Sequence, residues 1–230
     1  MKSVLFLSLC LLLISCQNAQ DCKSSATPTK EIKEDGTTPS TCTENPSPEN
    51  PSQDPLPTPP GEVPHEALIF DASVKFDKFE IDQEDKVHKA IEIIKKVVAS
   101  EEFRAKVLTF SYKDTGMFVD TKLTNEEVYE MILTGAETLT PEVDHEMDLE
   151  LELYYTSSST VGYTKPDTNK IWMNTKYFNV FTSTQVAGNI FHEWTHKLGF
   201  EHAFTYSVSR DSSVPYALGY LVRDLGKQYE

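Results

Sequence analysis

The sequence predicts an α+β domain over residues 64–230, and three observations support this. The composition changes near residue 64, from a stretch rich in proline and small polar residues to the mixture typical of globular proteins. Several segments beyond this point alternate apolar and polar residues, as half-buried strands do. Others repeat apolar residues at helical spacing. About 165 residues are enough chain for one domain with its own core.

The first part of the domain is expected to contain a strand, a helix and a second strand. Apolar residues favour an early strand around 67–76. A helix is predicted over 83–99, because its apolar residues fall on one face: Val87, Ala90, Ile91, Ile94, Val97 and Val98. A strand is predicted over 108–112, where leucine, phenylalanine and tyrosine alternate with polar residues.

A short helix is expected in the middle of the domain. Thr124 and Glu127 have the spacing of a capping box, in which the two side chains satisfy backbone N–H groups of the first turn. Gly135 follows the apolar residues of this segment, and glycine is the usual residue at a helix end. We therefore predict a helix that begins after Thr124 and stops at Gly135.

The clearest strand covers residues 149–155, where leucines and a tyrosine alternate with Glu150, Glu152 and Tyr154. The two glutamates could be interpreted as metal ligands, but alternation alone explains them as one solvated face of the strand. Residues 161–164 and 170–174 predict two further strands joined by a turn.

The next helix begins at a second capping box, formed by Thr182 and Gln185. At 100° per residue its apolar residues form one broad arc, and His192 and His196 fall on the opposite side. Gly188 weakens the helix but allows close packing against a neighbour. The apolar arc consists of Val186, Ala187, Ile190, Phe191, Trp194 and Leu198.

Residues 192–202 of this segment predict a catalytic metal site. His192 and His196 are four residues apart, so both imidazoles reach one ion from the same helical face. Gly199 can end the helix and turn the chain so that His202 supplies a third nitrogen. Three protein ligands leave one position for water, and Glu193 is placed to take the proton of that water. The alternative is a helix with ordinary histidines.

The stretch His192 to His202 resembles the long motif H-E-x-x-H-x-x-G-x-x-H of the metzincin clan of zinc endopeptidases, and it matches every fixed position. The resemblance implies that His192, His196 and His202 bind zinc and that Glu193 is the general base. It also implies a metzincin-like zincin domain, with a mixed twisted sheet, a backing helix, an active-site helix and a small C-terminal subdomain. An edge strand, either 161–164 or 170–174, would pair with an extended substrate.

The chain departs from the metzincin pattern after His202. Metzincins have a methionine-containing turn beneath the metal, but this chain has no methionine after Met173. Pro215 stands near the expected position and predicts a rigid turn with a cis bond as one option. Tyr216 is a candidate to bind zinc or stabilise the transition state, and a packed tyrosine is the alternative. Residues 216–227 then predict a helix.

The other histidines receive no role. His65 and His88 are expected to be surface residues. His145 lies in an acidic loop, residues 142–146, which could bind a second cation but is more simply a solvated loop.

Residues 1–15 are typical of a lipoprotein signal peptide, with a basic start and an apolar run too short to span a membrane. Leu13 to Cys16 resembles a bacterial lipobox, which implies lipidation of Cys16, whereas an ordinary cleaved signal peptide is the alternative. By the lipoprotein sorting rule, Gln17 implies the outer membrane. Residues 16–63 predict a proline-rich disordered tether, in which Cys22 and Cys42 either pair or remain free.

These observations lead to one functional hypothesis, a lipid-anchored monomeric zinc endopeptidase of the bacterial envelope that acts on peptides or proteins. The net charge of -15 argues against nucleic-acid binding. No cysteine lies beyond Cys42, so the domain has no thiolate metal ligands. The alternatives are a zinc-binding envelope lipoprotein without peptidase activity and an inert spacer on a decayed peptidase fold. Glu193 favours the enzyme, because a pure binder needs no carboxylate beside its first ligand.

Overall fold

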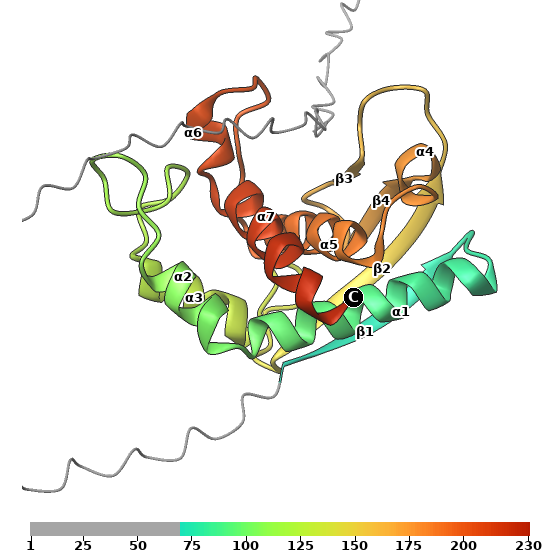
Figure 1. The fold of residues 1–230 in the computed structure, drawn as a ribbon, viewed down its shortest axis with the longest axis horizontal. Helices are drawn as coiled ribbons and strands as arrows, with labels where there is room; N and C mark the ends of the chain where they lie inside the picture. The colour runs from blue at the N-terminus through green and yellow to red at the C-terminus, as the bar shows by residue number, and fades with distance from the viewer. Residues whose placement is uncertain (1–69) are drawn as a thin grey trace, which may run out of the picture. The chain divides into compact units, whose positions relative to one another are not determined.

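The computed structural model describes residues 70–230, which form an α+β fold built on one four-stranded mixed sheet (Figure 1). The expectations for the signal peptide, the tether, Cys16, Cys22, Cys42 and His65 fall outside these residues. The strands are β1 (Asp71–Asp77), β2 (Glu146–Tyr154), β3 (Gly162–Thr164) and β4 (Lys170–Asn174).

The strand order in the sheet is β1-β2-β4-β3. The first three of these strands run parallel, and β3 pairs antiparallel with β4. All four strands were expected from their apolar patterns. Their order was not, and it decides which of the two candidate strands lies at an edge. That strand is β3, because β4 has a partner on each side.

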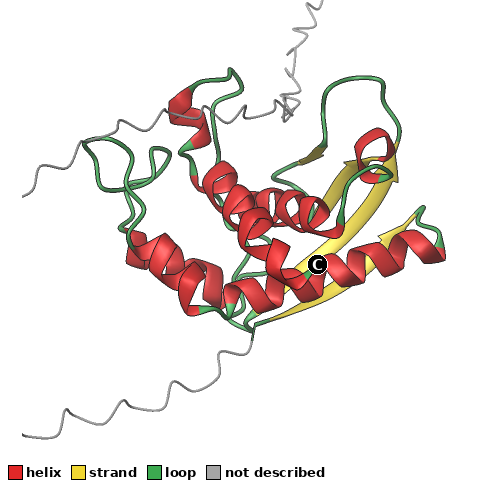
Figure 2. Ribbon diagram, in the orientation of Figure 1, coloured by secondary structure: helices red, strands yellow, loops and turns green. Residues whose placement is uncertain are grey.

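Helices follow the chain as α1 (Ile81–Val98), α2 (Glu101–Leu108), α3 (Asn125–Thr134), α4 (Thr175–Phe178), α5 (Ser183–Lys197), α6 (Val208–Asp211) and α7 (Val214–Gly226). A 3-10 turn, η1 (Lys227–Tyr229), ends the chain. Figure 2 shows α1 and α5 on one side of the sheet, and α7 packs against both helices. The apolar faces of these three helices and of the strands share one hydrophobic core.

The predicted helix boundaries are close to those observed. Helix α1 begins two residues before the expected start, and α3 has the predicted capping box at Thr124 and ends at Gly135. Gly135 has a φ of 68°, the left-handed conformation that glycine accepts most easily. Helix α5 has the predicted capping box of Thr182 and Gln185. In these segments, local side-chain chemistry determines where each helix begins.

The predicted strand over 108–112 is wrong. Leu108 is the last residue of α2, which begins after Ser100, whose hydroxyl accepts the N–H of Phe103. Phe103 and Val107 are four residues apart, and both are fully buried by the packing of α2 against its neighbours. Phe110 stacks on Phe118 in the loop that follows, rather than joining the sheet. The alternation that suggested a strand begins where the helix ends.

The segment after His202 also differs from expectation. Pro215 is not in a separate turn, and the described residues contain no cis peptide bond. Instead it lies in the first turn of α7, where a proline costs no helical hydrogen bond. Nor does α7 belong to a separate subdomain, since Val214, Leu218 and Val222 join the main core.

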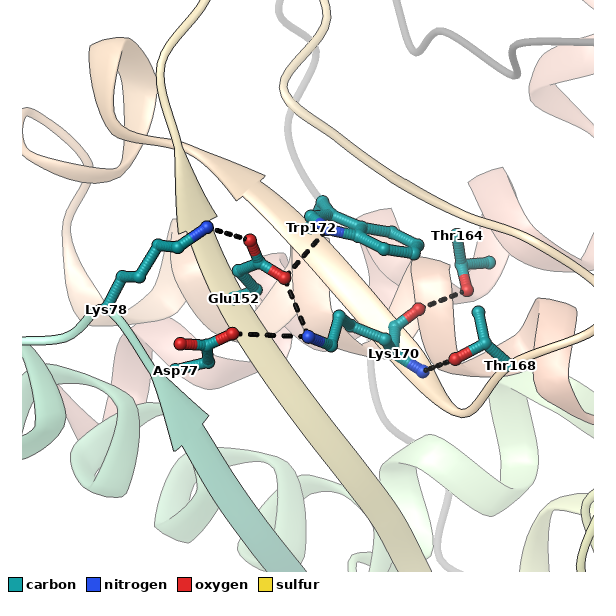
Figure 3. A network of polar contacts seen from close by, with 7 residues as sticks. All are labelled: Asp77, Lys78, Glu152, Thr164, Thr168, Lys170 and Trp172. Carbon is teal, nitrogen blue, oxygen red and sulfur yellow. Dashed lines mark hydrogen bonds and ion pairs between the residues drawn. The ribbon is translucent and has the colours of Figure 1, made fainter.

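The sheet face opposite the helices carries a charged network around Glu152 (Figure 3). Glu152 accepts hydrogen bonds from Lys78, from Lys170 at 2.7 Å and from the indole of Trp172 at 3.0 Å. The hydrogen bonds from Lys170 and Lys78 hold the pKa of Glu152 at about 2. The solvated-face interpretation holds for Glu150, whose side chain is 37% exposed and forms an ion pair with Lys75. It is wrong for Glu152, which is 9% exposed.

His145 and His88 lie away from any ligand cluster. His145 has Nδ1 at 2.6 Å from the carbonyl of Leu133 and bends the chain into β2. His88 is exposed beside the ring of Phe76. In residues 70–230, no helix is both long enough and apolar enough to cross a bilayer.

Candidate metal centre

Helix α5 positions two of the three predicted ligands. Its apolar arc is buried in the core, with Ile190, Phe191 and Trp194 fully inaccessible to solvent. His192 and His196, one turn apart, project from the opposite side with ring centroids 5.2 Å apart. The helix therefore presents both imidazoles to one position, as the motif predicted.

The third ligand is positioned by the turn after the helix. Gly199 has a φ of 95°, a conformation that side chains rarely adopt, and the helix stops two residues earlier, at Lys197. The returning chain places the ring of His202 at 5.2 Å from that of His192 and at 4.9 Å from that of His196. The structure thus brings together all three predicted ligands.

The distances within the triad suit one metal ion. One ligand atom from each histidine lies within 4.8 Å of the others, and among residues 70–230 this is the group that could hold an ion. The Nε2 atoms of His192 and His202 are 3.3 Å apart. Two nitrogens that bind one tetrahedral zinc at the usual bond length are also about 3.3 Å apart.

Backbone carbonyls fix which nitrogen of each ring is available. Nδ1 of His196 lies 2.6 Å from the carbonyl of Phe200, and Nδ1 of His202 lies 3.1 Å from that of Ala203. The ring of His192 hydrogen-bonds the backbone of Pro215, which has only a carbonyl to offer. Since Nε2 of His192 faces His202, Nδ1 is the donor. Metal-binding histidines are commonly oriented by such outer contacts.

This arrangement leaves the three Nε2 lone pairs directed at one another, and a cation would satisfy them. Nε2 of His196 is buried and has no hydrogen-bond partner. Buried polar atoms of this kind require an explanation, and a metal ion supplies one. Burial, helped by the neighbouring histidines, lowers the pKa of His196 to about 3 and holds the pKa of His192 well below its ordinary value. Both rings therefore stay in the neutral form that binds metal.

Glu193 lies outside the triad, as predicted for a general base rather than a ligand. Its side chain is fully buried, and it shares one face of α5 with Asn189 and Lys197, at intervals of four residues. Lys197 is 3% exposed. Burial lowers the pKa of Lys197 to about 8, and the carboxylate of Glu193 partly opposes this shift.

Tyr216 lies against the triad. Its ring centroid is 4.5 Å from that of His192 and 4.6 Å from that of His202. The guanidinium carbon of Arg210, a residue only 3% exposed, lies 4.4 Å from the same tyrosine ring, a cation–π contact. The tyrosine singled out from the sequence thus lies beside the three histidines.

Sequence reasoning did not anticipate the contacts that three residues make around this centre. Lys197 occupies a variable position of the motif, although its spacing from Glu193 could have indicated a shared helical face. Pro215 was expected to form a turn, but its contribution is its carbonyl, a group that every residue has, so no sequence signal marks this contact. Arg210 reaches Tyr216 through tertiary packing between α6 and α7.

No protein-family model matches this chain, and a search of curated proteins finds no significant match. The chemistry of the centre therefore rests on its own geometry. Three neutral imidazoles that converge on one point, with a buried carboxylate and a phenol beside them, can hold a metal ion and transfer protons next to it.

Proposed function

We propose that this protein is a zinc-dependent endopeptidase of the metzincin type. The observation that carries the proposal is the convergence of His192, His196 and His202 with Glu193 beside them. Nitrogen ligands in this number and geometry favour zinc among the common metals. A mixed sheet above an active-site helix, with an edge strand next to that helix, is compatible with this family.

The residues of the chain have distinct roles in the proposed reaction. A bound zinc ion would polarise the scissile carbonyl and make water a better nucleophile near neutral pH. Glu193 takes the proton from the attacking water and passes it to the leaving amine. Tyr216, held between the ligands and Arg210, donates a hydrogen bond to the developing oxyanion.

Strand β3 is the part of the sheet that binds the substrate in this proposal. It lies at the sheet edge and packs against α5, so its outer backbone groups face the region over the active-site helix. An extended peptide can add to such an edge as a further strand. The substrate would then lie with its scissile bond near Glu193.

Two variants of the purified protein test the function. Glu193→Ala should bind as much zinc as wild type and hydrolyse peptides about 10²–10⁴-fold more slowly, because only the general base is lost. His196→Ala should lose both zinc and activity, because one of the three ligands is gone. The measurements are zinc per chain and cleavage of a mixed peptide library, each with and without chelator.

The results separate the proposal from its rivals. Wild type that binds zinc but cleaves no peptide would support the zinc-binding lipoprotein. Glu193→Ala with activity within about threefold of wild type would show that another group is the base. Wild type with no more zinc than His196→Ala would contradict the metal site.

The location of the protein is a separate part of the proposal. We propose that Cys16 carries a lipid that anchors the chain in the bacterial envelope, with residues 16–63 as a tether. Cells that express Cys16→Ser should release the protein from the membrane fraction. Full retention of this variant in the membrane fraction would place the anchor elsewhere.

A further inference from the structure

We propose that Lys197 is a positioning residue that holds strand β3 over Glu193 and so sets the slot into which the substrate backbone fits. This inference rests on the proposed peptidase function. Lys197 lies inside the motif, at a position where the motif allows any residue. Lys197 is buried, although a lysine at the end of a helix would ordinarily extend into water.

The ammonium group of Lys197 binds the turn between β3 and β4. It donates one hydrogen bond to the carbonyl of Lys165 at 3.0 Å and another to the carbonyl of Thr168. The turn itself is closed by the N–H of Thr168, which donates to the carbonyl of Lys165 at 3.4 Å. Lys197 thus joins the last turn of α5 to the first residue after β3.

A second contact fixes the other end of β3 to the same helix. A Cβ atom on Gly162 would lie 3.0 Å from Oδ1 of Asn189 and 3.1 Å from the carbonyl oxygen of Trp172. The backbone of the strand therefore packs directly on the side chain of Asn189, so closely that a larger residue at position 162 would press against it.

The two anchors match in length and enclose the proposed base. Asn189 and Lys197 are eight residues apart, which is about 12 Å along a helix. Gly162 and Lys165 are three residues apart, which is about 10 Å in a strand. Strand β3 therefore runs along this face of α5, and Glu193 lies midway between the anchors, four residues from each. Moving the strand would change the distance between a bound peptide and Glu193.

Three substitutions test this positioning role. Lys197→Met keeps the length of the side chain but removes both hydrogen bonds. Lys197→Arg keeps a cation that can donate to the turn. Gly162→Ala displaces the strand at its other end and leaves every charge in place. Lys86→Met is the matched control, because Lys86 also donates to backbone carbonyls, those of Phe178, Asn179 and Phe181 at and after the end of α4, but in a different part of the fold.

The readouts are zinc content, backbone hydrogen exchange over residues 160–170, and kcat and KM for a cleaved peptide. In Lys197→Met we expect zinc content to be unchanged and exchange in 160–170 to be about tenfold faster, because one anchor is lost. We expect KM to rise about tenfold with kcat within about fivefold, because the slot is altered while the metal site is intact. Lys197→Arg should have a KM close to that of wild type, and Gly162→Ala should have a higher KM than wild type.

Several outcomes would overturn the inference. Exchange over 160–170 in Lys197→Met that equals that of wild type or of Lys86→Met would show that Lys197 does not hold the strand. A loss of kcat with unchanged KM would show that Lys197 acts on the chemistry and not on the slot. If Lys197→Met does not fold, an unchanged KM in Gly162→Ala would equally contradict the role of the strand position. A wild type that cleaves no peptide contradicts the proposed function instead, and the exchange measurement still tests the anchor.

Discussion

Gly188 in α5 and Gly219 in α7 bring the backbones of the two helices into direct contact. A Cβ atom on Gly188 would lie 2.7 Å from the carbonyl oxygen of Gly219, and one on Gly219 would lie 2.9 Å from that of Gly188. The contact is one turn from the metal centre on both helices, since His192 follows Gly188 by four residues and Tyr216 precedes Gly219 by three. Close approach here allows the ring of Tyr216 to reach that of His192.

Gly219→Ala should therefore destabilise the fold, although alanine is the better helix former by about 1 kcal/mol. The added methyl group would also lie 3.0 Å from Cβ of His192, so α7 must move away from α5. We expect a net loss of about 1–3 kcal/mol, the usual cost of overpacking, together with weaker zinc binding. Urea unfolding and a zinc titration measure the two effects. A variant with wild-type stability and zinc affinity would show that the helices need no glycine at this crossing.

Tyr216→Phe distinguishes a catalytic tyrosine from a packed one. Phenylalanine keeps the ring that contacts His192 and Arg210, so stability and zinc content should stay at wild-type values. If the hydroxyl stabilises the oxyanion, kcat should fall about 10²–10³-fold, as for the loss of one donor. Peptide cleavage and zinc content are measured on the same sample. Activity within about threefold of wild type would assign Tyr216 to packing alone.

The sequence predicts the cluster of three histidines well because its determinants are local. The spacing of His192 and His196, the stop at Gly199 and the capping box at Thr182 all act within a few residues of one another. The contacts that complete the centre depend on tertiary packing. Lys197 reaches a turn about 30 residues away in sequence, and Arg210 meets the ring of Tyr216, six residues further along the chain, through the packing of α6 against α7.

The errors in the prediction of the fold arise because it too depends on contacts between distant segments. The alternation from Leu108 to Tyr112 resembles a strand, and only the burial of Phe103 and Val107 against other elements reveals the helix before it. The strand pattern predicts a solvated Glu152, but the register with β1 and β4 brings Lys78 and Lys170 to it. Strand order is a long-range property, so the position of β3 at the edge required the structure.

Glu137 supports helix α5 on its buried side, and its removal should cost stability. Its Oε1 accepts the indole N–H of Trp194 at 2.7 Å and the backbone N–H of Asp148 at 2.9 Å. Glu137→Ala leaves the buried indole N–H and the partly buried backbone N–H without an acceptor, for which we expect a loss of about 2–4 kcal/mol. Glu137→Gln is the control, because its amide oxygen can accept the same two bonds. Equal stability of the two variants, measured by urea unfolding, would contradict this role.

Asp120 makes the stability of the N-terminus of α7 depend on pH. Its Oδ1 accepts the N–H of Val214 at 3.0 Å, whereas Oδ2 is buried and has no hydrogen-bond partner. Burial raises the pKa of this carboxyl from 3.8 to about 6. A raised pKa means that the folded state binds the proton more tightly than the unfolded state. The free energy of unfolding of the protein therefore falls as the pH rises from about 4 through 6, because Asp120 loses its proton in the folded state.

Asp120→Asn should remove this dependence, because its amide oxygen can still accept the N–H of Val214 and has no proton to lose. The free energy of unfolding of the variant relative to wild type should rise by roughly 1–2 kcal/mol between pH 4 and pH 7.5. We expect this change to be smaller than the full pKa shift would give, because Asp120 is only half-buried. Urea unfolding across this pH range measures the difference, with Asp114→Asn, an exposed carboxyl in the same loop, as the control. A difference between Asp120→Asn and wild type that stays constant with pH would show that this carboxyl titrates alike in the folded and unfolded states.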